Sequence, residues 1–263
     1  DLKNTTKEIK NKPPIVFKNE IKLLKKRLSK VHNGDYFIIQ GGDCAETFSD
    51  FNGELIKNKL NILLQMSVLL SYKTSLKTIR IGRIAGQFAK PRTSPTEIFN
   101  NIEFPSYRGD AINSLDCNLK SRTPDPLRML EAYNQSVYTL NLIRSIINSG
   151  YTNILNANEW DLDFIKQSPH VREYNKIIGK IQETLSFIKT VDRKSENIKN
   201  VELYEFFTSH EGLILEYEQA LTKFDPLEKK YYDYSGHMIW VGDRTRSING
   251  SHIEFVSGIE NPI

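Results

Sequence analysis

Cysteine is scarce in this chain of 263 residues, which contains only Cys44 and Cys117. Two cysteines cannot build a disulfide framework, and neither lies in a C-x-x-C pair or in a Cys/His ladder of the zinc-finger type. The sequence therefore excludes a disulfide scaffold and a structural zinc finger. It favours a protein of a reducing compartment.

Long apolar runs are also missing. The longest apolar stretch, residues 55–70, is interrupted by Lys57, Lys59 and Gln65. It falls short of the ~18 uninterrupted apolar residues that a membrane span requires. Residues 1–12 are charged and polar, without the apolar core of a secretory signal. We therefore expect no membrane partner. Because the chain begins at Asp1 without a methionine, we also expect its true N-terminus to be missing.

A strong excess of one charge is lacking too. Lysine and arginine number 36 against 32 acidic residues, which gives a formal net charge of +4, and 39% of the residues are hydrophobic. This composition is typical of a globular protein and excludes a polycationic or disordered chain. One basic cluster lies on an expected helix, and a solvated helix face explains it better than a nucleic-acid partner. Its members are Lys22, Lys25, Lys26, Arg27 and Lys30.

Apolar residues alternate between short runs and longer helical patterns, which predicts βα units around a parallel sheet. Five strands are expected, at residues 36–40, 78–81, 153–156, 203–207 and 237–241. Helices are expected at residues 18–30, 54–71, 127–149, 172–189 and 211–223. The third helix has the clearest ends, because Asp125 can cap it, Pro126 suits its first position and Gly150 can follow it.

The segment between the second and third expected strands is rich in proline. Residues 90–125 contain Pro91, Pro95, Pro105 and Pro124, which predicts a long irregular excursion. Excursions of this length inside a compact domain are often functional.

Glycine and polar residues crowd the positions that follow the expected strands. The runs are residues 41–46 (GGDCAE), 82–93 (GRIAGQFAKPRT), 208–212 (TSHEG) and 242–246 (GDRTR). In parallel α/β barrels the catalytic groups gather at the carboxyl ends of the strands. We therefore expect the functional site at this edge of the sheet.

Cys44 follows the first strand, after two glycines that let the backbone approach a ligand. A lone cysteine beside a strand is most often a small buried hydrophobe, and this interpretation stays open. The neighbouring Asp43 and Glu46 disfavour a nucleophilic thiolate and suit a cation, so a metal ligand is favoured over a nucleophile. A nucleophile would need His210 or His237 as its base, and no nucleophile elbow or cysteine-protease signature accompanies them.

A set of cationic side chains follows strands that should be neighbours. Its members are Arg83, Lys90, Arg92, Arg244 and Arg246. Taken singly, each is more often a surface charge than a ligand. Guanidinium forks bind phosphate dianions bidentately, and lysine adds a point charge, so the set favours a substrate with one or two phosphates. Thr93 can add a hydroxyl donor. Neither G-x-x-x-x-G-K-[ST] nor G-x-G-x-x-G occurs, so the common nucleotide-binding loops are disfavoured.

Several longer runs are specific enough to compare with known families. They are residues 40–46 (QGGDCAE), 83–92 (RIAGQFAKPR), 107–110 (YRGD) and 237–246 (HMIWVGDRTR). These runs resemble the class II 3-deoxy-D-arabino-heptulosonate 7-phosphate (DAHP) synthases. Residues 208–211 (TSHE) and 249–252 (NGSH) also look like that family, in the same order and at similar separations. The resemblance covers nearly the whole chain.

The resemblance implies an α/β fold, namely a (β/α)8 TIM barrel with extra helices. About the first five βα units would be present here, as an incomplete barrel. Residues 1–34 would form an N-terminal extension with the first helix, and residues 35–263 a partial barrel with a helical insertion at about 91–150. The chain ends at Ile263, where the family continues into a further strand and three more metal ligands. We therefore expect a fragment that neither holds metal tightly nor makes product alone.

The resemblance also implies an activity. Members of the family condense phosphoenolpyruvate with erythrose 4-phosphate and water to give DAHP and phosphate, the first step of the shikimate pathway. The resemblance makes Cys44 a ligand of a divalent metal, with manganese expected and cobalt or another divalent ion as alternatives. The phosphoenolpyruvate-binding positions would be Arg83, Asp243 and Arg244. The loop for erythrose 4-phosphate would contribute Lys90, Arg92 and Thr93. The expected catalytic residues are Arg83, Lys90 and Arg244.

One departure from the family pattern concerns Asp243, which stands where the family usually has glutamate. Its carboxylate is one methylene shorter, and a displacement of about an ångström can matter to catalysis. The competing hypothesis is a non-catalytic binding or regulatory protein derived from the same family. By resemblance, we also expect an aromatic amino-acid effector, a homo-oligomer of the full-length protein, and a location in the cytoplasm, or in the plastid of a plant or alga.

Overall fold

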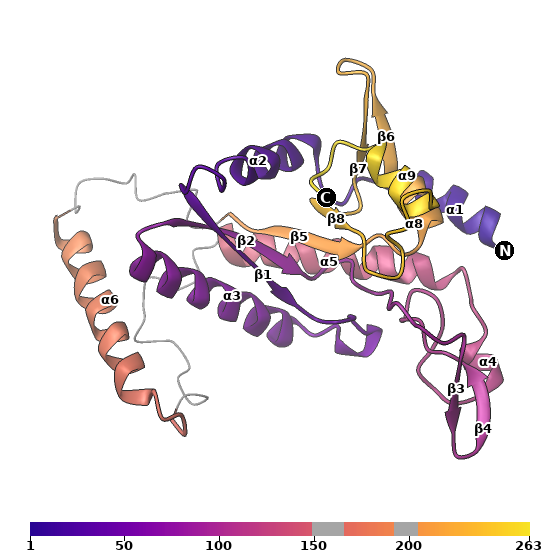
Figure 1. Cartoon of the computed structure of the whole chain (residues 1–263), viewed down its shortest axis with the longest axis horizontal. Helices are drawn as coiled ribbons and strands as arrows, with labels where there is room; N and C mark the ends of the chain where they lie inside the picture. Colours follow the sequence, from indigo (N-terminus) through magenta and orange to yellow (C-terminus); the bar gives the residue numbers. More distant parts are fainter. Residues whose placement is uncertain (149–165, 192–204) are drawn as a thin grey trace.

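The computed structural model describes residues 1–148, 166–191 and 205–263 (Figure 1). Its centre is a parallel sheet of four strands in the order β1–β2–β5–β8. The strands are β1 (Tyr36–Gly42), β2 (Lys77–Arg83), β5 (Phe207–Glu211) and β8 (Met238–Trp240). Their register pairs Gly42 with Arg83, Gly82 with Thr208, and Glu211 with Trp240. The carboxyl ends of these strands therefore meet at one edge of the sheet.

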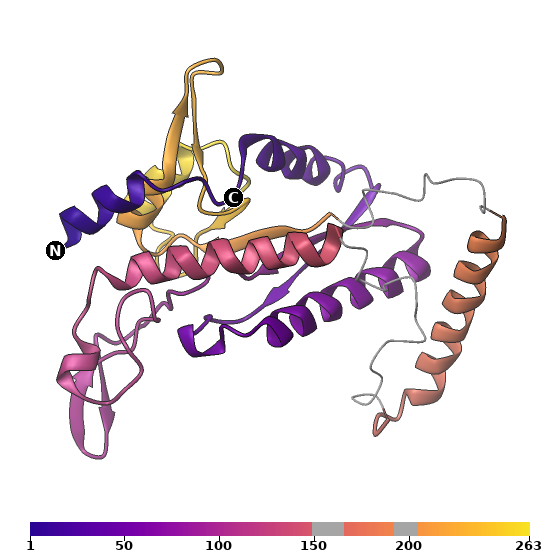
Figure 2. The same cartoon turned by 180° about the vertical axis from the view of Figure 1, so that it is seen from behind.

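Helices and two antiparallel hairpins surround this sheet. The helices are α1 (Leu2–Lys10), α2 (Lys18–Leu28), α3 (Gly53–Thr74), α4 (Leu119–Arg122), α5 (Arg128–Asn148), α6 (Val171–Val191), α8 (Leu215–Leu221) and α9 (Ser251–Ser257), with a 3-10 turn η1 at Phe48–Asp50. The hairpins pair β3 (Thr96–Phe99) with β4 (Ile102–Pro105), and β6 (Thr222–Asp225) with β7 (Lys230–Asp233). Seen from behind, α5 runs along the sheet (Figure 2). No helix among the described residues has both the length and the apolar character needed to cross a membrane.

Strand β2 is covered on both faces. Ile79 and Ile81 pack with Leu24 of α2. Arg80, between them, faces α3, where its Nε donates to Ser67 Oγ at 2.6 Å. Burial lowers the pKa of this arginine to about 10. Successive side chains of a strand point to opposite faces of the sheet, so β2 packs against α2 on one face and against α3 on the other.

The layer on the α3 side is built by two long helices. Leu60 and Leu64 of α3 pack against Ile143 and Ile146 of α5 in one apolar cluster. Both helices have side-chain acceptors at their N-terminal ends, of which only Asp125 is predicted from the sequence. Asn52 accepts from the first backbone N–H groups of α3, and Asp125 Oδ1 accepts from the N–H of Leu127 in the turn that leads into α5.

Two predicted elements differ from the structure. The strand expected at residues 203–207 begins at Phe207 and runs to Glu211, so the polar run TSHE lies within β5 and not after it. The helix expected at residues 211–223 is confined to α8, and residues 222–233 form the β6–β7 hairpin. The cause of the first error is that every residue of β5 is buried, polar ones included, which apolar periodicity does not reveal.

Most other elements agree with the sequence. The expected strands at 36–40, 78–81 and 237–241 and the four remaining expected helices are confirmed with small changes at their ends. The excursion at 90–125 contains the β3–β4 hairpin and the short helix α4. The strand expected at 153–156 and the helix end expected at Gly150 lie outside the described residues.

The parallel α/β arrangement is confirmed. The described strands do not show a closed barrel, so closure into a (β/α)8 barrel stays a prediction, as does the division of the chain at residues 34 and 35.

Three of the five members of the basic cluster pair with acidic side chains. Lys22 pairs with Glu228 and Lys25 with Glu260, each at 2.9 Å. Arg27 makes a two-pronged contact with Glu205, at 2.7 and 3.0 Å. These ion pairs tie α2 to the second half of the chain. The predicted solvated helix face is therefore only partly correct, because these three side chains are paired within the protein.

Glu20 joins α2 to two other parts of the structure. Its carboxylate accepts from Arg144 of α5 at 2.7 and 2.9 Å and lies 3.7 Å from Nε2 of the buried His237, directly before β8. It also accepts from the backbone N–H of Phe17 at the start of α2. Burial alone would raise the pKa of Glu20, but His237, the Phe17 amide and Arg144 together lower it to about 2.

We expect Glu20→Gln to lower the free energy of unfolding near neutral pH by about 1 to 2 kcal/mol, less than the full pKa shift implies because this side chain is a third exposed. The side-chain oxygen of glutamine can still accept from the backbone N–H of Phe17, but glutamine carries no charge. Because the folded-state pKa is depressed, the stabilisation is present above about pH 4.5 and is lost as pH falls toward 2.

Thermal unfolding followed by circular dichroism across this pH range measures the effect. Glu8→Gln, which alters an exposed pair with Lys12 on α1, is the matched control. Equal acid dependence in Glu20→Gln and the unaltered protein would contradict the assignment.

Candidate functional site

The carboxyl edge of the sheet is organised by close approaches of backbone. Gly42, the last residue of β1, has φ 142°, and a Cβ at this position would lie 2.4 Å from the carbonyl oxygen of Arg83. Only glycine allows the two strand ends to lie this close. The contact brings Arg83 Nη2 within 3.2 Å of the carbonyl oxygen of Cys44, which therefore lies beside the end of β2.

Glu46 fixes the turn that follows β2. Its buried carboxylate accepts from the backbone N–H groups of Ala85, Gly86 and Gln87 at 2.9, 2.9 and 2.7 Å. Ala85 has φ 62°, a left-handed conformation that costs free energy for a residue with a side chain. Burial raises the pKa of Glu46, and the three amides act in the opposite direction. This carboxylate therefore holds a strained turn in place.

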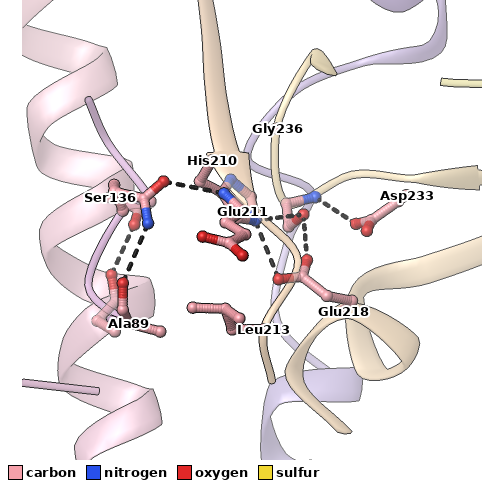
Figure 3. A network of polar contacts seen from close by, with 12 residues as sticks. Ala89, Ser136, His210, Glu211, Leu213, Glu218, Asp233 and Gly236 are labelled. Atoms are coloured by element: carbon pink, nitrogen blue, oxygen red, sulfur yellow. Dashed lines mark hydrogen bonds and ion pairs between the residues drawn. The ribbon is translucent and has the colours of Figure 1, made fainter. Parts of the chain in front are cut away.

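Gln87 extends this arrangement to the next strand. Its Oε1 accepts from the backbone N–H of Glu211 at 2.9 Å, and its Nε2 donates to the carbonyl oxygen of Ala89 at 3.0 Å. The segment after β1, the turn after β2 and the end of β5 are thus connected through two side chains, Glu46 and Gln87. Figure 3 shows Ala89 and Glu211 in this region.

The structure brings together part of the predicted cationic set. Arg244 Nε donates to Thr93 Oγ1 at 2.9 Å, which joins the loop after β8 to the loop after β2. The guanidinium of Arg83 lies 4.7 Å from the centre of the Trp240 ring, a cation–π contact between β2 and β8. Buried polar atoms of both residues, Arg83 Nε and Trp240 Nε1, have no hydrogen-bond partner among the described residues. The carboxyl edge of the sheet therefore has N–H donors that could bind an anion.

Of the other predicted ligands, Arg92 and Asp243 have side-chain partners within the protein. Arg92 pairs with Glu97 of β3, which also pairs with the buried Arg122. Asp243 is largely exposed and pairs with Arg246 at 2.6 Å. The backbone N–H of Lys90 donates to the carbonyl oxygen of Arg108 at 2.8 Å, and its side chain is partly exposed. Arg92 would have to exchange Glu97 for a ligand.

Cys44 is exposed, so its interpretation as a small buried hydrophobe is wrong. The two histidines named as its base are buried and bonded elsewhere: His210 Nε2 to Glu218 Oε1 at 3.0 Å, and His237 Nδ1 to the N–H of Thr208 at 2.9 Å. This geometry does not support a cysteine nucleophile.

A metal centre needs several ligands at one point. Within residues 1–148, 166–191 and 205–263, no group of three or more His, Cys, Asp or Glu side chains is placed to hold a metal ion. The described residues therefore do not make up a complete metal site around Cys44.

A buried polar network lies behind the site. Glu218 of α8 holds His210 with Oε1 and accepts from Ser235 with Oε2 at 2.7 Å, and Asp233 accepts from the Ser235 amide (Figure 3). Burial raises the pKa of Asp233 well above its usual value, and the nearby Glu218 charge acts in the same direction. The network fixes His210, against which Gly86 and Gly236 pack closely.

Glu211 is a site residue to which sequence reasoning assigned no role. It ends β5 with 4% of its surface exposed, and its Oε1 has no hydrogen-bond partner among the described residues. A Cβ on Gly242 would lie 2.1 Å from this oxygen. The resemblance includes Glu211 in the TSHE run, but a strand predicted four residues too early placed it in a loop or helix.

We expect Glu46→Gln to lower the free energy of unfolding by about 2 kcal/mol, because an amide cannot offer two acceptor oxygens to the three N–H groups. Urea-induced unfolding measures the change. Glu54→Gln, at an exposed position in the first turn of α3, is the control and should unfold as the unaltered protein does. A Glu46→Gln protein of undiminished stability would mean that the turn does not depend on this carboxylate.

Comparisons with known proteins agree with the resemblance in the sequence. The whole chain, residues 1–263, matches the model of the class-II DAHP synthetase family. A phospho-2-dehydro-3-deoxyheptonate aldolase of Streptomyces coelicolor is 41% identical over 262 residues, covering 100% of this chain and 58% of that protein. A protein of the same description from Neurospora crassa is 42% identical over 277 residues, covering 100% of this chain and 56% of that protein. The phospho-2-dehydro-3-deoxyheptonate aldolase AroG of Mycolicibacterium smegmatis is 38% identical over 256 residues, covering 95% of this chain and 54% of that protein. The chain thus spans a little over half the length of these relatives.

Proposed function

Since the chain belongs to the class-II DAHP synthetase family, we propose that the protein is a 3-deoxy-7-phosphoheptulonate synthase. It condenses phosphoenolpyruvate with erythrose 4-phosphate and water to give DAHP and inorganic phosphate. This transfer forms a carbon–carbon bond and starts the shikimate pathway to the aromatic amino acids.

The observation that carries the proposal is the contact between Arg244 and Thr93. It places a guanidinium from the loop after β8 against a hydroxyl from the loop after β2, at the edge where Arg83 also lies. Both substrates are phosphate esters, and phosphoenolpyruvate adds a carboxylate. Guanidinium groups are suited to bidentate binding of such anions.

We assign phosphoenolpyruvate to Arg83 and Arg244, with Asp243 beside them. We assign erythrose 4-phosphate to the loop of Lys90, Arg92 and Thr93. Arg83 has an unpartnered buried Nε, which supports its role as a ligand-binding donor. Asp243 holds Arg246, so its contribution is to orient the loop that carries Arg244.

The chain's own residues bind and align the reactants. Holding two anions at reacting distance despite their mutual repulsion supplies a large part of the reduction in activation free energy. The enol carbon of phosphoenolpyruvate bonds to the aldehyde carbon of erythrose 4-phosphate. Water adds its oxygen at C2, and the bond from C2 to the phosphate oxygen breaks, which releases inorganic phosphate. Arg83, Lys90 and Arg244 would touch the reacting groups.

The family is generally metal-dependent. We propose manganese as the metal and Cys44 as one ligand, since this thiol is exposed at the carboxyl edge of the sheet. A divalent metal at this place would supply a Lewis acid for the aldehyde oxygen. The described residues do not bring three ligands together, so no step is assigned to the metal here.

In the full-length protein expected from the sequence, we predict that Arg244→Lys lowers kcat/KM by about a hundredfold, because lysine keeps the charge but loses the fork and the contact with Thr93. The consumption of phosphoenolpyruvate in the presence of erythrose 4-phosphate and manganese measures the activity. Arg172→Lys, at an exposed position on α6, is the control.

Three outcomes of this assay are informative. Product formation that depends on Arg244 supports the proposed reaction. Binding of both substrates without product would favour the non-catalytic binding protein instead. Activity that is unchanged in Arg244→Lys would contradict the assignment of Arg244.

At manganese concentrations high enough to fill a weak site, we expect the metal to slow the reaction of Cys44 with a thiol reagent such as dithionitrobenzoate, because a metal-bound thiolate is shielded. The chain has two cysteines, so Cys117→Ser isolates the signal of Cys44, and Cys44→Ser shows the background from Cys117. Reaction of Cys44 at the same rate with and without manganese would contradict its role as a ligand.

A further inference from the structure

The Glu211 carboxylate occupies an unusual position at the carboxyl edge of the sheet. It lies at the end of β5, next to His210 in Figure 3, and is almost fully buried. Its Oε1 lies 2.1 Å from the place that a Cβ on Gly242 would take, and it has no hydrogen-bond partner among the described residues. A buried carboxylate with an unpartnered oxygen is costly unless positive charge stands near it.

The positive charges that act on this carboxylate come from three elements. The guanidinium of Arg83, at the end of β2, lies 4.7 Å from the centre of the Trp240 ring, and Trp240 is the register partner of Glu211. Arg244 in the loop after β8, and His252 of α9 when it is protonated, also act on the carboxylate. Glu218 and His210, which line the same small cavity, are bonded to each other, and Gln87 and Trp240 beside the carboxylate are neutral. Glu211 is therefore an acidic group within the sheet on which the charges of both arginines act.

Burial raises the pKa of Glu211 above its usual value, while the Gly242 amide, Arg83, Arg244 and His252 act in the opposite direction. Because these effects on the pKa oppose each other, the protonation state of Glu211 is sensitive to any change in the net charge around the two arginines. Arg83 and Arg244 are also the residues assigned to the anionic substrate.

We propose that Glu211 couples anion binding to proton uptake: it is the counter-ion of Arg83 and Arg244 in the empty site and takes up a proton when an anion occupies them. This inference rests on the proposed function for the identity of the anion, phosphoenolpyruvate. The coupling itself requires only that an anion binds at these arginines.

The physical reason is reciprocal linkage. A bound dianion neutralises the arginines and adds negative charge near the Glu211 carboxylate, so the charged form loses its stabilisation. If the anion favours the protonated form, protonation must favour the anion by the same factor. Anion affinity therefore increases as pH falls, by at most about tenfold per pH unit for one coupled proton.

Calorimetric titration with inorganic sulfate tests the coupling, because sulfate itself does not titrate near neutral pH. Binding heats measured in two buffers of different ionisation enthalpy, at several values between about pH 6 and 8, give the number of protons taken up. The same titrations with phosphoenolpyruvate report on the proposed substrate. We expect a fraction of a proton, and at most one, to be taken up per anion bound.

Glu211→Gln is the decisive variant, since it keeps the shape that packs on Gly242 and removes the titrating charge. We expect it to bind sulfate more tightly at the alkaline end and to lose the proton uptake. Glu216→Gln, at an exposed position on α8, is the matched control and should behave as the unaltered protein.

The proposal is overturned if the unaltered protein binds sulfate without proton uptake, if neither anion binds, or if the uptake persists in Glu211→Gln. The first of these needs no variant, so a folding failure of Glu211→Gln leaves the test intact. Formation of DAHP without proton uptake would overturn the coupling and leave the proposed function standing. Proton-linked sulfate binding without product would support the coupling and count against the proposed function.

Discussion

The carboxylate of Glu46, held by three consecutive backbone amides, is the interaction on which the carboxyl edge of the sheet depends. It stabilises a left-handed conformation at Ala85 that a free chain would avoid. The turn that it fixes presents Gln87 to the end of β5 and leads into the loop of Lys90, Arg92 and Thr93. A single buried acid thus aligns segments that follow three different strands, and the cost of its burial is offset by charge-assisted hydrogen bonds.

Much of the sheet could be predicted from the sequence because its first two strands are short apolar runs bounded by turns. Ile79 and Ile81 mark β2 clearly, and only the buried Arg80 departs from that pattern. Strand β5 was misplaced for the opposite reason. Its Thr208, Ser209 and His210 are buried, and Thr208 Oγ1, Ser209 Oγ and His210 Nε2 have hydrogen-bond partners outside β5 that the sequence does not display.

The candidate site likewise contains residues that could be predicted from the sequence and residues that could not. The arginines could be recognised because they follow strands in runs with specific neighbours, and the structure does place Arg244 against Thr93. The pairing of Arg92 with Glu97 could not be foreseen, since it depends on how the β3–β4 hairpin folds back. Glu211 was missed as a functional group because its environment comes from Gly242, Arg83 and Arg244, which are distant in sequence and meet only in the folded chain.

Glu20 binds Arg144 across 124 residues of sequence, and Lys18 of the same helix pairs with Asp225 across 207. Such distant contacts are formed late, since the chain loses much entropy in closing loops of this size. We therefore expect α2 to pack in its final position only after α5 and the β6–β7 hairpin have formed. During synthesis on the ribosome, α2 would therefore emerge long before its partners, with its apolar face exposed to chaperones in the meantime.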